Sequence, residues 1–289
     1  MPQEGHALMG RAGPHHVGPP DHGSVSWRIH CEVILLLGWG RAILMQFGHP
    51  LVARGVADHS HFRRGTSAWW HRLQGTVQVL LASTFGGRAE AVGAIRRMNR
   101  VHDSIHGELQ ETQGRFLVGS QYSARDPSLV AWVHATTLDS FVRAYELYVT
   151  PLSDDQKNLY CNEASWTESL FGVPPATFPQ SWQELQDYIR MMLASADIAV
   201  TDTARILAAE LLHPALPMIA APLVAMARLP TIGLLPTSLR AAYGFEWGRQ
   251  QHLALHGCAA VLRSVLPWVP PPVRYWKTAR QAVRQAGSG

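Results

Sequence analysis

The stretch DPSLVAWVHATTLDSFVRAYELY, residues 126–148, decides the fold class. Asp126 and Pro127 begin it, and proline suits the first turn of a helix because the amide donors of that turn have no partner within the helix. Thr150 and Pro151 end it. Apolar residues inside the stretch recur at intervals of three and four rather than two, which predicts a helix.

The same periodicity continues along the chain, and alternating runs of β-branched residues are missing. The sequence SDDQ at Ser153–Gln156 has the pattern of a capping box, and Gly172 is typical of a residue that ends a helix. The sequence therefore predicts an all-α protein. Further helices are expected over 33–47, 79–105, 153–171, 181–196, 201–212 and 249–264.

The composition indicates one large domain. The chain has 289 residues, of which 47% are hydrophobic and 16% are charged. A chain of this length buries roughly three quarters of its unfolded surface, enough for an interior that holds a prosthetic group. The first 26 residues are rich in Gly, Pro and His and lack the apolar core of a secretory signal, so we expect a disordered leader. We expect the helical domain over 27–275 and a short tail over 276–289.

Several function classes are disfavoured. The formal net charge is +4 and the pI about 9.2, but lysine is nearly absent and the arginines are scattered, so no basic stripe indicates nucleic-acid binding. The three cysteines are far apart and form no CxxC pair, which favours a reducing, cytoplasmic location over a disulfide framework or a zinc site. The apolar stretch 33–47 is interrupted by Arg41 and is too short to span a membrane.

An ordered run of His, Arg and Thr residues lies within these apolar helical segments. It comprises His49, DHSHF at 58–62, RLQGT at 72–76, VHDSIHG at 101–107 and WVHAT at 132–136. Imidazoles on apolar helix faces indicate a buried metal or cofactor site. His102 and His106 are four residues apart, which on one helix would place both rings on the same side. The HExxH pattern of zinc hydrolases has Glu where Asp103 stands, so that class is disfavoured.

Several of these segments, taken in order, resemble the MpaB-type oxygenase family, whose catalytic domain is shared with the rubber oxygenase called latex clearing protein. The resemblance spans roughly residues 30–250. It is carried by LLLGWGRAILMQFGHPLVARGVADHSHF, the R-x-x-x-T of Arg72 and Thr76, the His102 segment, YSARDPSLVAWVHATTLDSF, FGVPP and LPTSLRAAYGFEW.

The resemblance implies a globin-like helical domain that encloses a non-covalent b-type haem. By motif, the proximal iron ligand falls on His102, with His134 as the second candidate. The distal Arg and Thr of the rubber oxygenase branch fall on Arg72 and Thr76, and its distal Lys corresponds to Gly75.

The catalytic Glu of that branch falls near Asp58, a shorter carboxylate. Arg41, Arg54 and Arg143 are candidates for binding the haem propionates, because a guanidinium matches the geometry of a carboxylate. Arg72, Thr76 and Asp58 would polarise dioxygen on the face of the haem opposite His102. The family implies an apolar substrate, either isoprenoid-like or a natural-product intermediate. A monooxygenase would also need an electron donor.

Two other classes of function fit the residues. A non-haem iron oxygenase would need two histidines and a carboxylate on one face of a site. Its ligands would come from His49, His59, His61, His102, His106 and His134. Alternatively, a helical protein without a cofactor could bind a lipid-like ligand.

Overall fold

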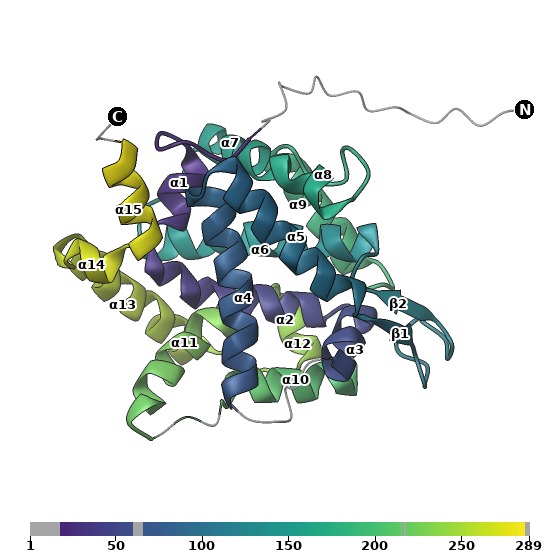
Figure 1. Ribbon diagram of the computed structural model, residues 1–289. Helices are drawn as coiled ribbons and strands as arrows, with labels where there is room; N and C mark the ends of the chain where they lie inside the picture. The colour runs from purple at the N-terminus through teal and green to yellow at the C-terminus, as the bar shows by residue number, and fades with distance from the viewer. Residues whose placement is uncertain (1–17, 60–65, 215, 217, 287–289) are drawn as a thin grey trace, which may run out of the picture.

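The described chain is almost wholly helical. A computed structural model describes residues 18–59, 66–214, 216 and 218–286 (Figure 1). The strands within these residues are β1 (His106–Glu108) and β2 (Gln121–Ser123), which form one antiparallel hairpin. The predicted all-α class is confirmed. No helix in the described ranges combines the length and apolar character that crossing a membrane requires.

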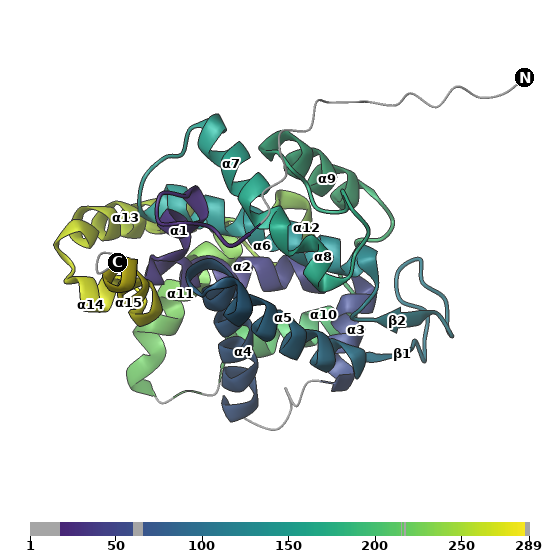
Figure 2. The same ribbon diagram turned by 45° about the horizontal axis from the view of Figure 1, so that its top comes forward.

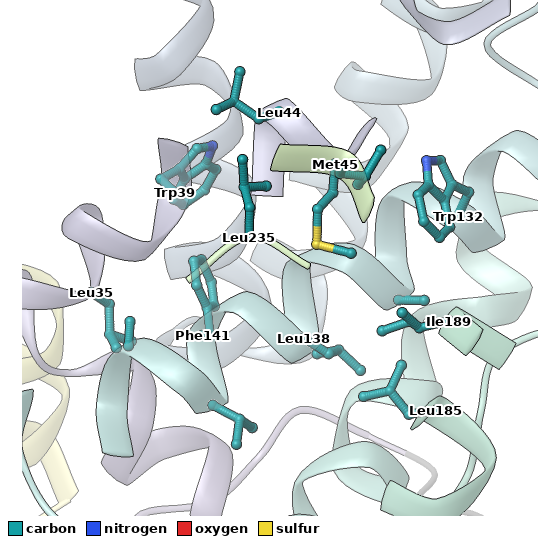
Figure 3. Close-up of a cluster of buried hydrophobic side chains, with 14 of the residues drawn as sticks. Leu35, Trp39, Leu44, Met45, Trp132, Leu138, Phe141, Leu185, Ile189 and Leu235 are labelled. Carbon is teal, nitrogen blue, oxygen red and sulfur yellow. The ribbon is translucent and has the colours of Figure 1, made fainter. Parts of the chain in front are cut away.

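Helices α2 (Leu36–Phe47) and α6 (Pro127–Tyr148) pack against each other at the centre of the fold. Figure 3 shows Trp39 and Met45 of α2 near Phe141 and Leu138 of α6, within the main cluster of buried side chains. The two backbones approach closely at Gly38. A Cβ atom at this position would lie 2.7 Å from the Ala144 Cβ atom. Only glycine fits that contact without displacing one helix.

The local signals for α6 and α7 (Asp154–Ala164) act as the sequence predicts. The Asp126 carboxylate accepts a hydrogen bond of 2.8 Å from the Ser128 amide, and Pro127 occupies the first turn of α6. Ser153 and Gln156 form the predicted capping box of α7. The predicted helix over 153–171 is interrupted, because a 3-10 turn over 165–167 separates α7 from α8 (Glu168–Phe171).

Helices α4 (Thr66–Phe85) and α5 (Arg88–Asp103) are joined at Gly86 and Gly87 and then diverge (Figures 1 and 2). Helix α1 (Val25–His30) packs against both α4 and α7, and α8 packs against α5. We call α4 and α5 together the helical hairpin, and the end where they are joined its apex.

The remaining helices surround this centre. Their bounds are α3 (Pro50–His59), α9 (Trp182–Ala194), α10 (Asp202–Leu212), α11 (Ala221–Gly233), α12 (Thr237–Ala242), α13 (Arg249–Val265), α14 (Pro271–Arg274) and α15 (Lys277–Ala286). Of the leader predicted over 1–26, residues 1–17 lie outside the described part, and α1 already begins at Val25. The tail predicted over 276–289 contains α15, which packs against α4. The domain division remains a prediction.

A buried ion pair joins α2 to α6. Arg41 Nη2 lies 2.6 Å from Asp139 Oδ2, and both side chains are almost fully buried. Arg143 and Gln186 donate further hydrogen bonds to the same carboxylate. Arg41 also donates to Ser140 Oγ and to the Leu234 carbonyl. Burial alone would raise the pKa of the Asp139 carboxyl, but Arg41 and Arg143 hold it below its ordinary value.

We expect Asp139→Ala to lower the free energy of unfolding by about 3–5 kcal/mol, because it leaves the Arg41 charge buried without a counter-charge. The control is Asp187→Ala, which breaks an exposed pair with Arg190 and should cost less than about 1 kcal/mol. Denaturant unfolding of both variants measures the difference. Equal losses would show that the buried pair contributes no more than a surface pair.

Candidate functional site

A cavity of about 330 Å³ extends along the helical hairpin and is bounded by α2 and α6. Most of its wall is apolar, and cavities of this size hold small-molecule ligands. The apolar wall includes Trp39, Phe47, Leu80, Met98, Leu138 and Phe178. Polar side chains reach the cavity from α1, α4, α5, α6 and α7.

His102 lies in the last turn of α5, is half-buried and lines this cavity. The prediction that His106 follows it on the same helix is wrong. Helix α5 ends at Asp103, and His106 is an exposed residue of β1 paired with Ser123. The β1–β2 hairpin replaces the next helical turn at Gly107, where a Cβ atom would lie 2.5 Å from the Tyr122 hydroxyl oxygen. The structure therefore does not place these two rings as a pair on one helix face.

His134 lines the cavity from α6, where its ring stacks on Phe178 at a centroid distance of 3.8 Å. Its Nε2 atom is buried and has no hydrogen-bond partner among the described residues. Burial lowers the pKa of His134 to about 3, so the ring is neutral at ordinary pH. A neutral imidazole with an available nitrogen can ligate a metal or bind a polar ligand atom.

Thr76 lines the cavity from α4, on the arm of the hairpin opposite His102. Arg72 lies one helical turn earlier on α4, and its side chain is outside the described part. Gly75 is exposed, and a Cβ atom there would meet nothing within 4 Å. The structure thus places the predicted proximal ligand and Thr76 on the two diverging arms of one hairpin.

Asp58, on α3, is not among the described residues that line this cavity. Its carboxylate forms an ion pair with Arg54 at 2.6 Å and accepts a hydrogen bond of 2.6 Å from the Tyr122 hydroxyl. Burial and the bond to Asp58 raise the pKa of Tyr122 above its ordinary value. Because Tyr122 does line the cavity, Asp58 is connected to it through this tyrosine.

The other predicted histidines are dispersed. His49 is buried against Phe116, and burial lowers its pKa to about 4. His59 Nε2 lies 3.1 Å from the His106 carbonyl oxygen, and His61 is outside the described residues. Within the described ranges, no group of three or more His, Cys, Asp or Glu side chains is placed to hold a metal ion. The candidate histidines that the structure describes thus do not form such a group, and the non-haem iron alternative remains a prediction.

Arg41 and Arg143, predicted to contact haem propionates, lie elsewhere. Neither lines the cavity, and both bind Asp139. Arg54 likewise binds Asp58.

A polar cluster at the hairpin apex was missed by the sequence reasoning. His30 Nδ1 lies 2.8 Å from Thr84 Oγ1, and His30 Nε2 lies 2.8 Å from the Tyr160 hydroxyl oxygen. All three side chains line the cavity. The partners of His30 are 54 and 130 residues away in the chain, so no local spacing connects them. The only signal for this cluster in the sequence was the polar ring of His30 beside the apolar stretch 33–47.

These features define an almost wholly helical protein with a mostly apolar cavity, lined by the neutral imidazoles of His30 and His134. Residues 27–264 match the family model of the catalytic domain described as ER-bound oxygenase mpaB/B'/Rubber oxygenase. The chain belongs to this oxygenase family, as its motifs predicted, and is assigned to the oxidoreductases on that basis. Neither the curated proteins nor the solved structures contained a match.

The buried, neutral state of His134 makes stability depend on pH. The pKa of a histidine in the unfolded chain is about 6.5, so acid protonates the unfolded state first. Stability from this residue is complete above that value and is lost as the pH falls toward about 3. Between about pH 7 and pH 5, His134 should account for a loss of about 2 kcal/mol. Denaturant unfolding of His134→Phe, which keeps a ring against Phe178, should show an acid loss smaller by that amount. An unchanged pH dependence would contradict it.

Proposed function

We propose that this chain is a haem b-dependent oxygenase that uses dioxygen to oxidise an apolar small molecule, with His102 as the proximal iron ligand. The observation that carries the proposal is the placement of His102 and Thr76 on the two arms of the hairpin, facing one apolar cavity. Family membership supports the oxygenase activity. The haem and its ligand are the further step that we propose.

The residues around the cavity fit a haem in their chemistry. A haem needs apolar walls around the porphyrin and a side-chain ligand for its iron, for which imidazole is suitable. The cavity provides both, with Met98 and Phe178 among the apolar wall residues. The buried, unpartnered Nε2 atom of His134 is a second polar atom that a bound group would satisfy. Activation of dioxygen is the chemistry that a bound haem would supply.

The protein's own residues would hold the cofactor and polarise the oxidant. His102 would bind iron from the end of α5. Thr76 and, by its match to the family motif, Arg72 would donate hydrogen bonds to dioxygen from the side of the cavity opposite His102. Asp58 would act through Tyr122, whose hydroxyl it holds. Arg41 and Arg143 would contribute only indirectly, through their ion pairs with Asp139, because neither lines the cavity.

The apolar wall favours an apolar substrate, and the family resemblance favours an isoprenoid-like molecule or a natural-product intermediate. A dioxygenase reaction transfers both oxygen atoms and needs no further reductant. A monooxygenase reaction would require two electrons from a donor.

The first test is the ultraviolet-visible spectrum of the purified chain after addition of haemin. We expect a Soret band that shifts when carbon monoxide is added to the dithionite-reduced protein. His102→Ala should lose the band, whereas the matched control His106→Ala should keep it, because His106 is exposed on β1. Retention by His102→Ala with loss in His134→Ala would move the ligand to α6. Absence of the band from the unmodified chain would overturn the haem proposal, and iron analysis of the purified chain would then distinguish a non-haem iron oxygenase from a cofactor-free, lipid-binding protein.

A second test addresses the distal side. Arg72→Ala should keep the Soret band but raise the carbon–oxygen stretching frequency of the carbon monoxide complex, because a nearby positive donor weakens that bond. Arg72→Lys retains a positive charge and should shift the frequency less, and Thr76→Val tests the hydroxyl alone. Infrared spectra of the three variants give the comparison. Identical frequencies in all proteins would remove Arg72 and Thr76 from the distal site.

A further inference from the structure

The apex of the hairpin carries a polar cluster within an otherwise apolar cavity. We call Ser26, His30, Thr84, Tyr160 and Glu163 the apex cluster; all five line the cavity. They come from α1, α4 and α7. Ser26 and His30 are four residues apart on α1, so both side chains point to the same side of that helix.

The hydrogen bonds of His30 leave donor capacity in the cluster. Burial lowers the pKa of His30 to about 3, so its ring is neutral and carries one N–H group. When Tyr160 donates to Nε2, Nδ1–H donates to Thr84 Oγ1, and the Thr84 hydroxyl proton is left for another acceptor. In the opposite tautomer, Nε2–H donates to Tyr160, and the tyrosine proton is left instead. Either tautomer thus leaves one hydroxyl proton of the cluster for a ligand.

Ser26 supplies the second, independent observation. Its side chain is 1% exposed, and its Oγ atom has no hydrogen-bond partner among the described residues. A buried hydroxyl without a partner costs free energy that a bound polar atom recovers. The neighbouring Glu163 carboxylate is already engaged, because it accepts hydrogen bonds from the Val25 and Ser26 amides at 3.1 and 2.7 Å.

The charges at the apex select a neutral ligand group. No arginine or lysine is among the described residues that line the cavity, whereas Glu163 adds a negative charge. A carboxylate at the apex would be buried without a counter-charge and close to another carboxylate, which is unfavourable. A hydroxyl or carbonyl oxygen has no such cost, and the free Ser26 hydroxyl can donate to either.

We propose that the apex cluster is a subsite for the neutral hydroxyl or carbonyl group of an otherwise apolar substrate. His102 lies at the opposite end of α5, about 20 Å from the apex by helical rise. The site therefore fits an elongated molecule that has its polar group at the apex and its chain directed toward His102. The subsite stands on its own contacts, while its role in positioning a substrate rests on the proposed oxygenase function.

The test compares three ligands of equal chain length by isothermal titration calorimetry on the purified full chain, with haemin added. Decanol presents a hydroxyl, decyl chloride a similar volume without a donor, and decanoate a charge. We expect decanol to bind about tenfold more tightly than decyl chloride, the value of about one well-placed hydrogen bond. Decanoate at about pH 8 should bind more weakly than decanol.

The variants Ser26→Ala and Thr84→Val should each reduce the preference for decanol to roughly threefold or less. Ser26→Ala should leave the unfolding midpoint unreduced, because the lost hydroxyl has no hydrogen-bond partner among the described residues. The matched control Thr137→Val removes another cavity-lining hydroxyl, one that donates to the Val133 carbonyl, and should keep the tenfold preference.

Three results would overturn the subsite. The first is equal binding of decanol and decyl chloride, or no binding of either ligand. Either outcome would mean that the Ser26 hydroxyl binds only a water molecule. The second is decanoate binding as tightly as decanol. The third is an unchanged preference in both apex variants. The Soret band reports haem binding separately, so failure of the haem proposal and failure of the subsite give different results.

Discussion

The buried contact between Arg41 and Asp139 is the constraint on which the rest of the structure depends. It lies between the two central helices, where both charges have lost their water. Such a pair adds little net stability, but a shift of either helix would leave a charge without its partner at high cost. Gly38 allows the close approach that the pair requires. We infer that the ion pair and the glycine together fix the register of α2 against α6.

That register determines the cavity wall. Trp39 and Phe47 of α2 and His134 and Leu138 of α6 all line the cavity. The opposite wall comes from the helical hairpin, which is connected through Gly86. A Cβ atom at Gly86 would lie 2.6 Å from the Ala82 carbonyl oxygen, so this connection admits no larger residue without rearrangement. The His30 bond to Thr84 then joins α1 to the apex. The cavity thus lies between the packed pair α2 and α6 on one side and the diverging arms of the helical hairpin on the other.

Sequence reasoning succeeded where the cause is local. The Asp126 cap, the Ser153–Gln156 capping box and the period of α6 involve residues within a few positions of each other. The motif resemblance also located the family correctly. The expectation from helical spacing failed at His106, because pairing with Ser123 in the β1–β2 hairpin replaced the expected helical turn. Asp58 and the apex cluster depend on contacts between distant segments, such as Tyr122 with Asp58, and spacing along the chain does not encode these.

The distribution of charge along the cavity assigns different tasks to its two ends. At the apex, His30 and Tyr160 are neutral, and the Glu163 carboxylate is satisfied by backbone amides, so this end can recognise a polar group but cannot neutralise a negative one. The described lining residues include no arginine or lysine elsewhere. Reduction of dioxygen develops negative charge, and stabilising that charge requires a positive or strongly donating group. On α4, Arg72 lies one turn from Thr76, which lines the cavity opposite His102. If the oxidation occurs in this cavity, the negative charge that develops on dioxygen would therefore be stabilised at the Arg72 end of the helical hairpin. The apex would then hold the polar group of the substrate.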